Sequence, residues 1–474
     1  MPLENNYKHG VYIEETTTAL QPMLTVADPP VVIGTASKGP TNIPTPITSF
    51  RQFAEVFGYT GDWQTFTCEE VAYTFFTLYN LTPIMVINVA DSAKHTKNST
   101  KDLSGTSAPF TIENTPMILD TLVVKSGTKT LVLNDDYAVE QSGLTITLTV
   151  LKQTNITGDA IQLTYKEWDS TKFTNADVIG GTNVSTGKKT GIEAVEDVYP
   201  LHGLIPGTLL APKFSETPEV ALVLASKARN INGVFKTMAV SDIPTSTVIK
   251  YSDVNAYKNS HSLVDEHLVL CWPKVGLGDN QYYLSTHLAA LAAYVDADKN
   301  DGIPLESPSN KILKISGSVL SDGTQVALSK VEANILNGQG IVTALNFNGQ
   351  RLWGSRTSIF PTSSDPKDVW IPTRRMMNFV GNQLAVNYFS QIDVPINKRL
   401  VERVLDKCGC YLNGLTARGA LLGGKIACLA EDNPPSSLVD GIIIFRVQIC
   451  PPSPSRVIQF TLSYDVNMYQ NLFS

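Results

Sequence analysis

Three glycine-containing segments come close to motifs that bind phosphate, calcium or a dinucleotide. Residues 419–425 have the glycine and lysine spacing of a phosphate-binding loop, in which backbone N–H groups and the lysine surround the phosphates. The next residue is Ile426, whereas magnesium needs a serine or threonine hydroxyl at that position. The element predicted before this segment is also a helix, not a strand. We therefore interpret residues 419–425 as an ordinary connection.

The two other near matches lack required residues in the same way. Residues 296–302 (DADKNDG) resemble a calcium-binding loop, but the glycine is seventh instead of sixth. Ser307 stands where the bidentate glutamate of such a loop is needed. Gly276 and Gly278 begin a dinucleotide fingerprint that Gln281 interrupts at the third glycine. Polar turns account for both segments.

The nucleophiles and metal-ligating residues form no recognisable site. The cysteines are scattered, and they are Cys68, Cys271, Cys408, Cys410, Cys428 and Cys450. Cys408 and Cys410 lie two residues apart on a predicted helix, so their side chains point in different directions. The histidines do not cluster, and no Gly-x-Ser-x-Gly elbow is present. We predict no catalytic, cofactor-binding or metal-binding residue, hence no enzyme and no cofactor.

Composition narrows the function classes further. The chain has 474 residues, of which 44 are acidic and 37 basic, for a net charge of −7. Charged residues make up 17% and hydrophobic residues 43%, which is typical of a folded protein. The net negative charge argues against nucleic-acid binding by phosphate neutralisation. Apolar runs fall short of the roughly 20 residues of a membrane helix, and the start of the chain lacks a secretory pattern. We expect no direct membrane insertion, and sparse cysteines fit a reducing cytoplasm.

The elements that would carry any site alternate between strand and helix. Residues 31–34, 68–80 and 83–90 predict a strand, a helix and a strand, an order typical of an α/β layer with parallel strands. Residues 144–150 alternate with a period of two, which predicts an antiparallel sandwich or barrel. The last third of the chain predicts two helices followed by two strands, at residues 373–389, 396–415, 441–447 and 457–466.

These patterns predict an α/β core layer with an inserted antiparallel β domain and an α+β C-terminal domain, with extended arms at both ends. The expected units are an N-terminal arm (1–25), a core in two segments (26–100 and 207–364), an inserted β domain with its linker (101–206), a C-terminal domain (365–456) and a C-terminal arm (457–474).

Both ends of the chain carry strand-like residues. They are Val11 and Ile13 near the start, and Ile458, Phe460, Leu462 and Tyr464 near the end. A terminal strand is suited to adding to an exposed sheet edge of a neighbouring molecule. The alternative is that each strand completes a sheet of its own chain.

Residue order in the C-terminal third gives a more specific signal. The segments that carry it are 418–424, 431–435, 445, 451–454, 460 and 464–465. Further segments that contribute to the same signal lie upstream, at residues 9–14, 296–308, 336–341 and 353–357. Together these segments resemble the contractile tail sheath proteins of myovirus phages, especially the branch shared with R-type pyocins. The resemblance does not extend to about residues 91–206.

The resemblance implies a structural role. Such subunits stack as hexameric rings into a helical sheath around a tail tube, and terminal strands link neighbours. The partners implied are further copies of the chain, the tail tube protein, and baseplate and terminator proteins. The implied location is the virion tail, assembled in the host bacterial cytoplasm. Rigid subunits then rearrange on contraction and drive the tube through the bacterial envelope.

A basic region in the C-terminal helices is the expected tube contact. Its residues are Arg374, Arg375, Lys398, Arg399, Arg403 and Lys407. The alternative is that they lie on solvated helix faces and pair with Glu402 and Asp406. A second function class also stays open, in which the inserted β domain makes the chain a carbohydrate-binding or adhesin-type tail protein.

Overall fold

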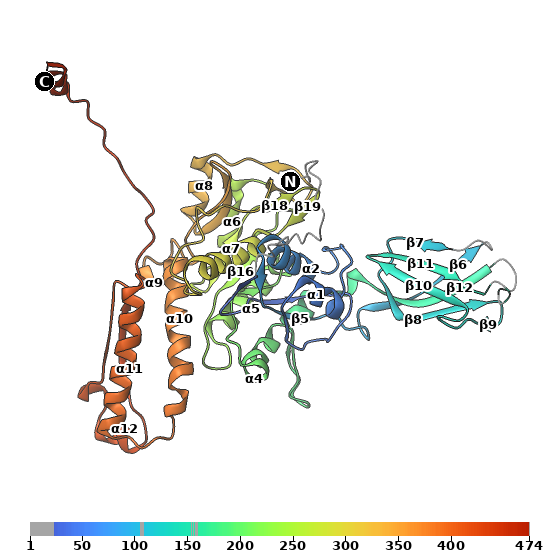
Figure 1. Cartoon of the computed structure of the whole chain (residues 1–474), viewed down its shortest axis with the longest axis horizontal. Helices are drawn as coiled ribbons and strands as arrows, with labels where there is room; N and C mark the ends of the chain where they lie inside the picture. Colours follow the sequence, from blue (N-terminus) through green and yellow to red (C-terminus); the bar gives the residue numbers. More distant parts are fainter. Residues whose placement is uncertain (1–22, 105–108, 153, 155, 157–159, 474) are drawn as a thin grey trace, which may run out of the picture.

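The computed structural model describes residues 23–104, 109–152, 154, 156 and 160–473. Figure 1 shows a layered central body with an elongated β unit on one side and a pair of long helices on the other. The last residues leave the helix pair as a single extended strand of chain (Figure 1). Within the described residues no helix is both long and apolar enough to cross a bilayer.

An eight-stranded sheet forms the middle of the central body. Its central strands are parallel, and the edge strands β23 and β3 are antiparallel to their neighbours. From edge to edge the strands are β23 (Gln350–Trp353), β22 (Ile341–Asn346), β17 (Leu268–Cys271), β16 (Ala239–Asp242), β15 (Leu209–Leu210), β2 (Val31–Gly34), β5 (Ile84–Asn88) and β3 (Thr45–Ile47).

Helices cover both faces of this sheet. Within β2, Val32 packs into one apolar cluster, and Val31 and Ile33 pack into the other. One face carries α1 (Phe50–Phe57), α2 (Cys68–Ala72), η1 (Tyr73–Leu78) and α7 (Leu284–Lys299). The other carries α4 (Val198–His202), α5 (Pro218–Arg229), α6 (Tyr251–Ser260) and α8 (Lys330–Asn337). Burial on both faces explains why the strand at 31–34, as predicted, is apolar throughout.

The projecting β unit is a sandwich of two antiparallel sheets around its own apolar cluster. One sheet has the order β10 (Tyr137–Ser142), β11 (Thr145–Val150), β7 (Phe110–Ile112), and the other has β6 (Thr96–Ser104), β12 (Ala160–Trp168), β8 (Met117–Ser126), β9 (Lys129–Thr130). Thr96 pairs with Trp168, so the unit leaves and rejoins the body at one place. There the Trp168 indole donates to the Ser37 carbonyl at 2.8 Å and its ring packs on Phe66.

Residues 170–206 differ from the prediction that they belong with the inserted domain. They form η3 (Ser170–Lys172), α3 (Asn175–Ile179), a hairpin of β13 (Gly181–Thr182) and β14 (Lys189–Thr190), η4 (Gly191–Asp197) and α4. Val178, Ile192 and Val195 are fully buried in the cluster beneath the core sheet. These apolar residues make the segment part of the core layer. The Gly- and Thr-rich composition of the hairpin concealed this in the sequence.

Two smaller sheets complete the central body. β1 (Leu24–Thr25) pairs in parallel with β4 (Leu81–Thr82). An antiparallel sheet has the order β19 (Asn280–Tyr282), β18 (Lys274–Leu277), β20 (Gly317–Val319), β21 (Gln325–Val326), and η5 (Phe214–Glu216) precedes α5.

The C-terminal part is a helical hairpin with a two-stranded sheet packed on it. It comprises α9 (Pro366–Val369), α10 (Ile371–Tyr388), η6 (Phe389–Gln391), α11 (Lys398–Ala417), β24 (Gly423–Ala427), η7 (Ala430–Asp432), α12 (Pro435–Val439), β25 (Arg446–Cys450) and η8 (Val466–Phe473). The mixture of helices and several sheets agrees with the predicted α/β and α+β content. The two long helices lie within two residues of their predicted bounds.

Of the last two predicted strands, the first is misplaced and the second has no partner within the described chain. Of the strand predicted at 441–447, only the end lies in β25. The Asn433 side chain holds Ile444 in a loop, accepting from its N–H at 2.7 Å and donating to its carbonyl at 3.0 Å. The strand predicted at 457–466 has no ladder with any described residue. A strand needs a partner, and this segment has none within the described chain.

Candidate assembly site

The phosphate-like and calcium-like segments have other roles in the structure. Gly419 follows the end of α11, and Gly423 to Lys425 begin β24, so this segment joins a helix to a strand. Asp296 of the calcium-like segment is an ion-pair partner of Arg375. Cys408 is buried and Cys410 exposed, as their spacing on a helix predicted. Among the described residues, no group of three or more His, Cys, Asp or Glu side chains is arranged to hold a metal ion.

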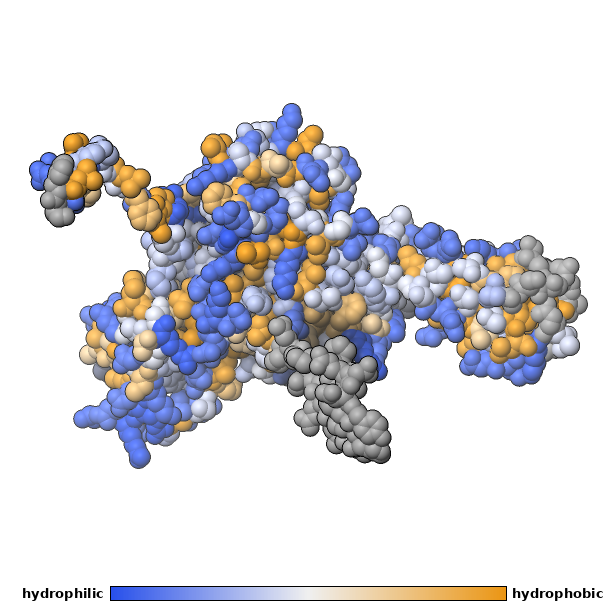
Figure 2. All heavy atoms as spheres, turned by 45° about the horizontal axis from the view of Figure 1, so that its top comes forward, coloured by the Kyte–Doolittle hydropathy of each residue, from blue (hydrophilic) through white to orange (hydrophobic). Residues whose placement is uncertain are grey.

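An unusual surface within the described residues is the C-terminal arm, residues 451–473. Ile458, Phe460, Leu462 and Tyr464 are 73%, 84%, 96% and 77% exposed. The arm extends away from the body, and apolar residues are distributed along its length (Figure 2). Large apolar side chains gain roughly 1.5–3 kcal/mol each when they are buried. A segment of this kind is therefore suited to binding another surface.

A matching surface lies at the root of the arm, in the sheet of β24 and β25. These strands pair antiparallel in the register Gly423↔Cys450 to Ala427↔Arg446. The sheet has two strands only, so within the described chain each strand keeps one edge without a ladder. Such edges present unpaired N–H and C=O groups to any incoming strand. A two-stranded sheet is also marginally stable alone, which favours addition of further strands.

The inner face of this sheet packs on the helix α11. Val447 and Ile449 are half-buried against the apolar cluster of the hairpin, while the alternate residues Arg446, Gln448 and Cys450 face solvent. Gly424 lies so close to α11 that an added Cβ would meet Leu412 at 3.0 Å. This contact sets the distance between the β24–β25 sheet and α11. A strand added at either edge would thus have one apolar face and one solvated face.

The six basic residues predicted as a tube contact divide into two groups. Arg374 and Arg375 are 12% and 14% exposed, and they pair with Asp368 and Asp296 of the same chain. These intrachain ion pairs give both arginines a structural role, and their tube contact stays a prediction. Their partners lie 6 and 79 residues away in sequence, which no local pattern reveals.

The other four basic residues remain on the surface of α11. Lys398, Arg399, Arg403 and Lys407 are exposed, and the last three recur every fourth residue. This spacing places them along one helix face. Lys398 lies 3.7 Å from Glu402, as the alternative reading expected for that residue. Val11 and Ile13, predicted as strand donors, lie outside the described residues.

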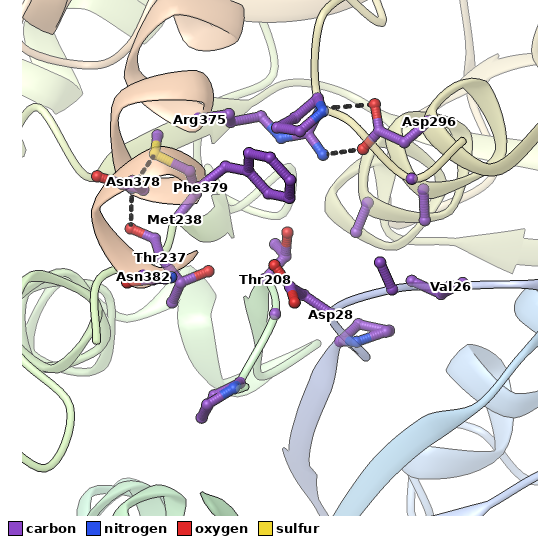
Figure 3. Close-up of a pocket in the computed structure, with 18 of the residues that line it drawn as sticks. Val26, Asp28, Thr208, Thr237, Met238, Asp296, Arg375, Asn378, Phe379 and Asn382 are labelled. Carbon is purple, nitrogen blue, oxygen red and sulfur yellow. Dashed lines mark hydrogen bonds and ion pairs between the residues drawn. The ribbon is translucent and has the colours of Figure 1, made fainter. Parts of the chain in front are cut away.

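A polar pocket marks the joint between the central body and α10 (Figure 3). The Arg375 guanidinium faces the Asp296 carboxylate of α7, and Asp28 lies in the same pocket. Burial raises the pKa of Asp28 and of Asp296 to about 6, and the Arg375 charge opposes both shifts. One turn along α10, the Asn378 amide donates to the Thr237 carbonyl at 3.1 Å. The pocket thus ties the helix that carries the C-terminal domain to the body.

Asn382 extends the same attachment by a further turn of α10. Its amide nitrogen donates to the Lys236 carbonyl at 2.8 Å, and its oxygen accepts from the Lys236 N–H at 2.9 Å. Charged and amide side chains at 375, 378 and 382 thus follow one face of α10. The sequence contains these polar residues, but it does not reveal that their hydrogen-bond and ion-pair partners lie in the layer of the core sheet.

A second set of buried carboxylates lies where α7 begins. Glu70 accepts from the Tyr283 N–H at 2.8 Å, and Asp242 at the end of β16 accepts from the Ser285 N–H at 3.0 Å. Burial raises the pKa of Glu70 to about 8 and that of Asp242 to about 7. Both carboxylates therefore accept hydrogen bonds from N–H groups at a helix N-terminus, where negative charge is favoured. Burial has the larger effect, so the pKa of each carboxyl group is raised.

These shifts predict that the fold is more stable at pH 6 than at pH 9. A carboxyl group whose pKa rises on folding stabilises the fold below its unfolded pKa, and this contribution is lost as pH rises through the folded value. Thermal unfolding at both pH values measures the difference. Asp242→Asn should reduce it, whereas Asp279→Asn, at an exposed carboxylate, should not. Equal or greater stability at pH 9 would contradict this assignment.

Comparison with known proteins gives a relative that spans nearly the whole chain and two others that span more than half of it. The tail sheath protein of Burkholderia phage BcepMu is 29% identical over 467 residues, 95% of each chain. The putative prophage major tail sheath protein of Pseudomonas aeruginosa is 27% identical over 290 residues, 59% of this chain and 70% of its own. The tail sheath protein of Escherichia phage P2 is 25% identical over 281 residues, 58% and 67% of the two chains. No family model matches the sequence.

Solved structures give the same fold. A chain of the anti-feeding prophage baseplate has a TM-score of 0.59 at 15% identity, covering 97% of this chain and 100% of its own. A chain of the contracted sheath complex of an extracellular contractile injection system (PVC) has a TM-score of 0.58 at 15% identity, covering 98% and 99%. Together with the curated relatives, these matches confirm the resemblance to contractile tail sheath proteins inferred from the motifs.

Proposed function

Because the chain is homologous to contractile tail sheath proteins along 95% of its length, we propose that it is the structural subunit of such a sheath. The homology to the phage BcepMu protein is the observation that carries this conclusion. The subunit is a structural protein and not an enzyme. It polymerises around a tail tube and contracts to drive the tube through the bacterial envelope.

Assembly proceeds through the terminal arms. In our proposal, subunits form hexameric rings that stack helically, and each C-terminal arm adds a strand to the β24–β25 sheet of a neighbour. The exposed residues Ile458, Phe460, Leu462 and Tyr464 support this role. Val11 and Ile13 are proposed as the donors of the N-terminal arm. Main-chain hydrogen bonds supply cohesion, and alternate side chains supply fit.

Contraction is a change of packing between rigid bodies. The central body, its attachment to α10 and the C-terminal domain move as one unit, while the extended arm absorbs the change in distance between neighbours. The free-energy difference between the two packings is set during assembly, so a nucleotide or metal has no required role. A sheath held on its tube in the longer packing therefore contracts once its contacts at the baseplate change.

The domain division that we propose treats the inserted β sandwich as an outward decoration of the sheath. Replacing residues 97–167 with a two-glycine link is expected to leave polymerisation unchanged, because Thr96 and Trp168 are paired neighbours. The retained Trp168 still covers Phe66. Electron microscopy of the purified variant measures the outcome. A folded variant that never polymerises would show that the sandwich is part of an assembly contact.

We propose that Arg399 and Arg403 of α11 contact an acidic tube surface, with Lys398 and Lys407 beside them. Changing both arginines to glutamate should weaken sheath assembly on tubes about ten-fold at low salt, and less at high salt, since exposed charges are screened. Lys125→Glu with Lys129→Glu, two exposed cations of the β sandwich, is the matched control. Unchanged assembly of the glutamate variant at low salt would show that this surface of α11 does not contact the tube.

The partners follow from the sheath role. They are further copies of this chain, the tail tube protein, and the baseplate and terminator proteins, within a virion tail assembled in the host cytoplasm. The alternative of a carbohydrate-binding adhesin has no support, because the relatives reported above are named as sheath proteins.

Negative-stain microscopy of the purified chain tests the proposal. Hollow, ridged helical tubules that form without tube protein would support it. A monomer or small oligomer that never polymerises, even with tube protein, would refute it.

A further inference from the structure

The C-terminal domain contains an apolar groove of about 960 Å³ that the described chain leaves unfilled. One wall is the α10–α11 connection and the start of α11, including Ile392 and Leu400. The other wall is the segment after α12, including Ile442 and Phe445. Leu438 of α12 also lines the groove. Protein interiors are close-packed, so an apolar space of this size beside a small core indicates a missing apolar occupant.

The groove lies at one end of the β24–β25 sheet. Ile426 and Val447 pair with each other in the ladder, and both line the groove. The arm leaves the domain at the opposite end, after Cys450. The residues that follow an added strand can therefore enter the groove only if that strand runs toward the Ala427–Arg446 end of the sheet. That direction is antiparallel to β25 and parallel to β24.

The segment that follows the predicted strand is itself apolar and compact. η8 (Val466–Phe473) is a 3-10 helix that carries the exposed apolar side chains Met468 and Leu472. Its side chains find no core beneath them, since η8 stands clear of the body at the far end of the arm (Figure 1). At about 3.3 Å per residue, the 15 residues of 451–465 reach roughly 50 Å. This span is long enough to reach a neighbouring subunit.

We propose that η8 of one copy docks in this groove of the neighbouring copy whose sheet receives residues 458–464. This inference rests on the proposed sheath assembly and adds a second anchor to it. The strand supplies main-chain pairing, and η8 fills the apolar space at the end of the same sheet. The docking fixes the polarity and the register of the added strand, because only one direction brings Met468 and Leu472 to Leu400, Ile442 and Phe445.

Cross-linking in the full chain tests the docking. A photoreactive benzoylphenylalanine replaces Met468, and isotopically heavy and light copies are mixed so that cross-links between copies are recognised by mass. We expect cross-links between copies into residues 392–404 or 438–447. Tubules that form with cross-links elsewhere, or only within one copy, would overturn the docking but leave the sheath role intact. Absence of both tubules and cross-links between copies would overturn both.

Charge substitutions give an independent readout. Ile442→Asp in the groove, and Met468→Asp with Leu472→Asp in η8, should each raise the protein concentration needed for polymerisation at least ten-fold. Val439→Asp, which is exposed but outside the groove, and Asn467→Asp with Gln470→Asp are the matched controls. Equal assembly by the groove variants and their controls would contradict the proposal.

Discussion

A chain that ends at Pro454 is expected to remain folded and to lose polymerisation entirely. Of the removed residues, the structure describes 455–473, which carry the exposed apolar side chains of the arm and contribute none to the described buried clusters. Thermal unfolding should therefore be unchanged, whereas sedimentation should show no large species. Each lost contact of Ile458, Phe460 or Leu462 removes roughly 1.5–3 kcal/mol of burial from every subunit junction.

The alternation of the arm provides a sharper form of this test. Phe460→Asp lies on the apolar side of the added strand, and we expect it to prevent assembly as the truncation does. Thr461→Asp introduces the same charge one residue later, on the opposite side, and should leave assembly intact. If both variants polymerise equally, residues 458–464 do not add to a neighbouring sheet as a strand.

The second large effect is expected at the joint of α10 with the central body. Arg375→Ala removes the cation that faces Asp296 and leaves two carboxyl groups, Asp28 among them, in a mostly buried pocket. Removing one partner of a buried ion pair destabilises by about 3 kcal/mol. The midpoint of urea unfolding measures this loss. The C-terminal domain should also become more sensitive to proteolysis, because α10 carries it.

An exposed ion pair supplies the control for Arg375. Lys398 and Glu402 lie 3.7 Å apart with side chains 90% and 58% exposed. Pairs of this kind contribute little, so Lys398→Ala should leave the unfolding midpoint unchanged. An Arg375→Ala variant as stable as Lys398→Ala would show that the pocket does not hold the joint. The rigid-body description of contraction would then lose its main support within the subunit.

Local patterns in the sequence predicted the layers of the fold well. The apolar run 31–34 indicated a buried strand, and the period of two at 144–150 indicated an antiparallel sandwich or barrel. The helices near 373–389 and 396–415 followed from their periodicity. The chemistry of individual residues argued only against an enzyme. The family motifs in the C-terminal third then indicated the class of protein.

Long-range partners were the part that the sequence did not reveal. Arg374 and Arg375 were counted as surface cations because their acidic partners lie elsewhere in the chain. The apolar run at 442–445 was taken as a strand, but the Asn433 side chain holds it as a loop. For the strand predicted at 457–466, the described chain contains no pairing partner. In our account that partner is another copy, which single-chain patterns cannot distinguish from an internal one.

A helical reconstruction of tubules assembled from the purified chain would show directly how the arms pair. We expect each β24–β25 sheet to have gained a strand formed by residues 458–464 of a neighbouring subunit. Tubules in which this sheet keeps only two strands, with each arm folded on its own subunit, would contradict it.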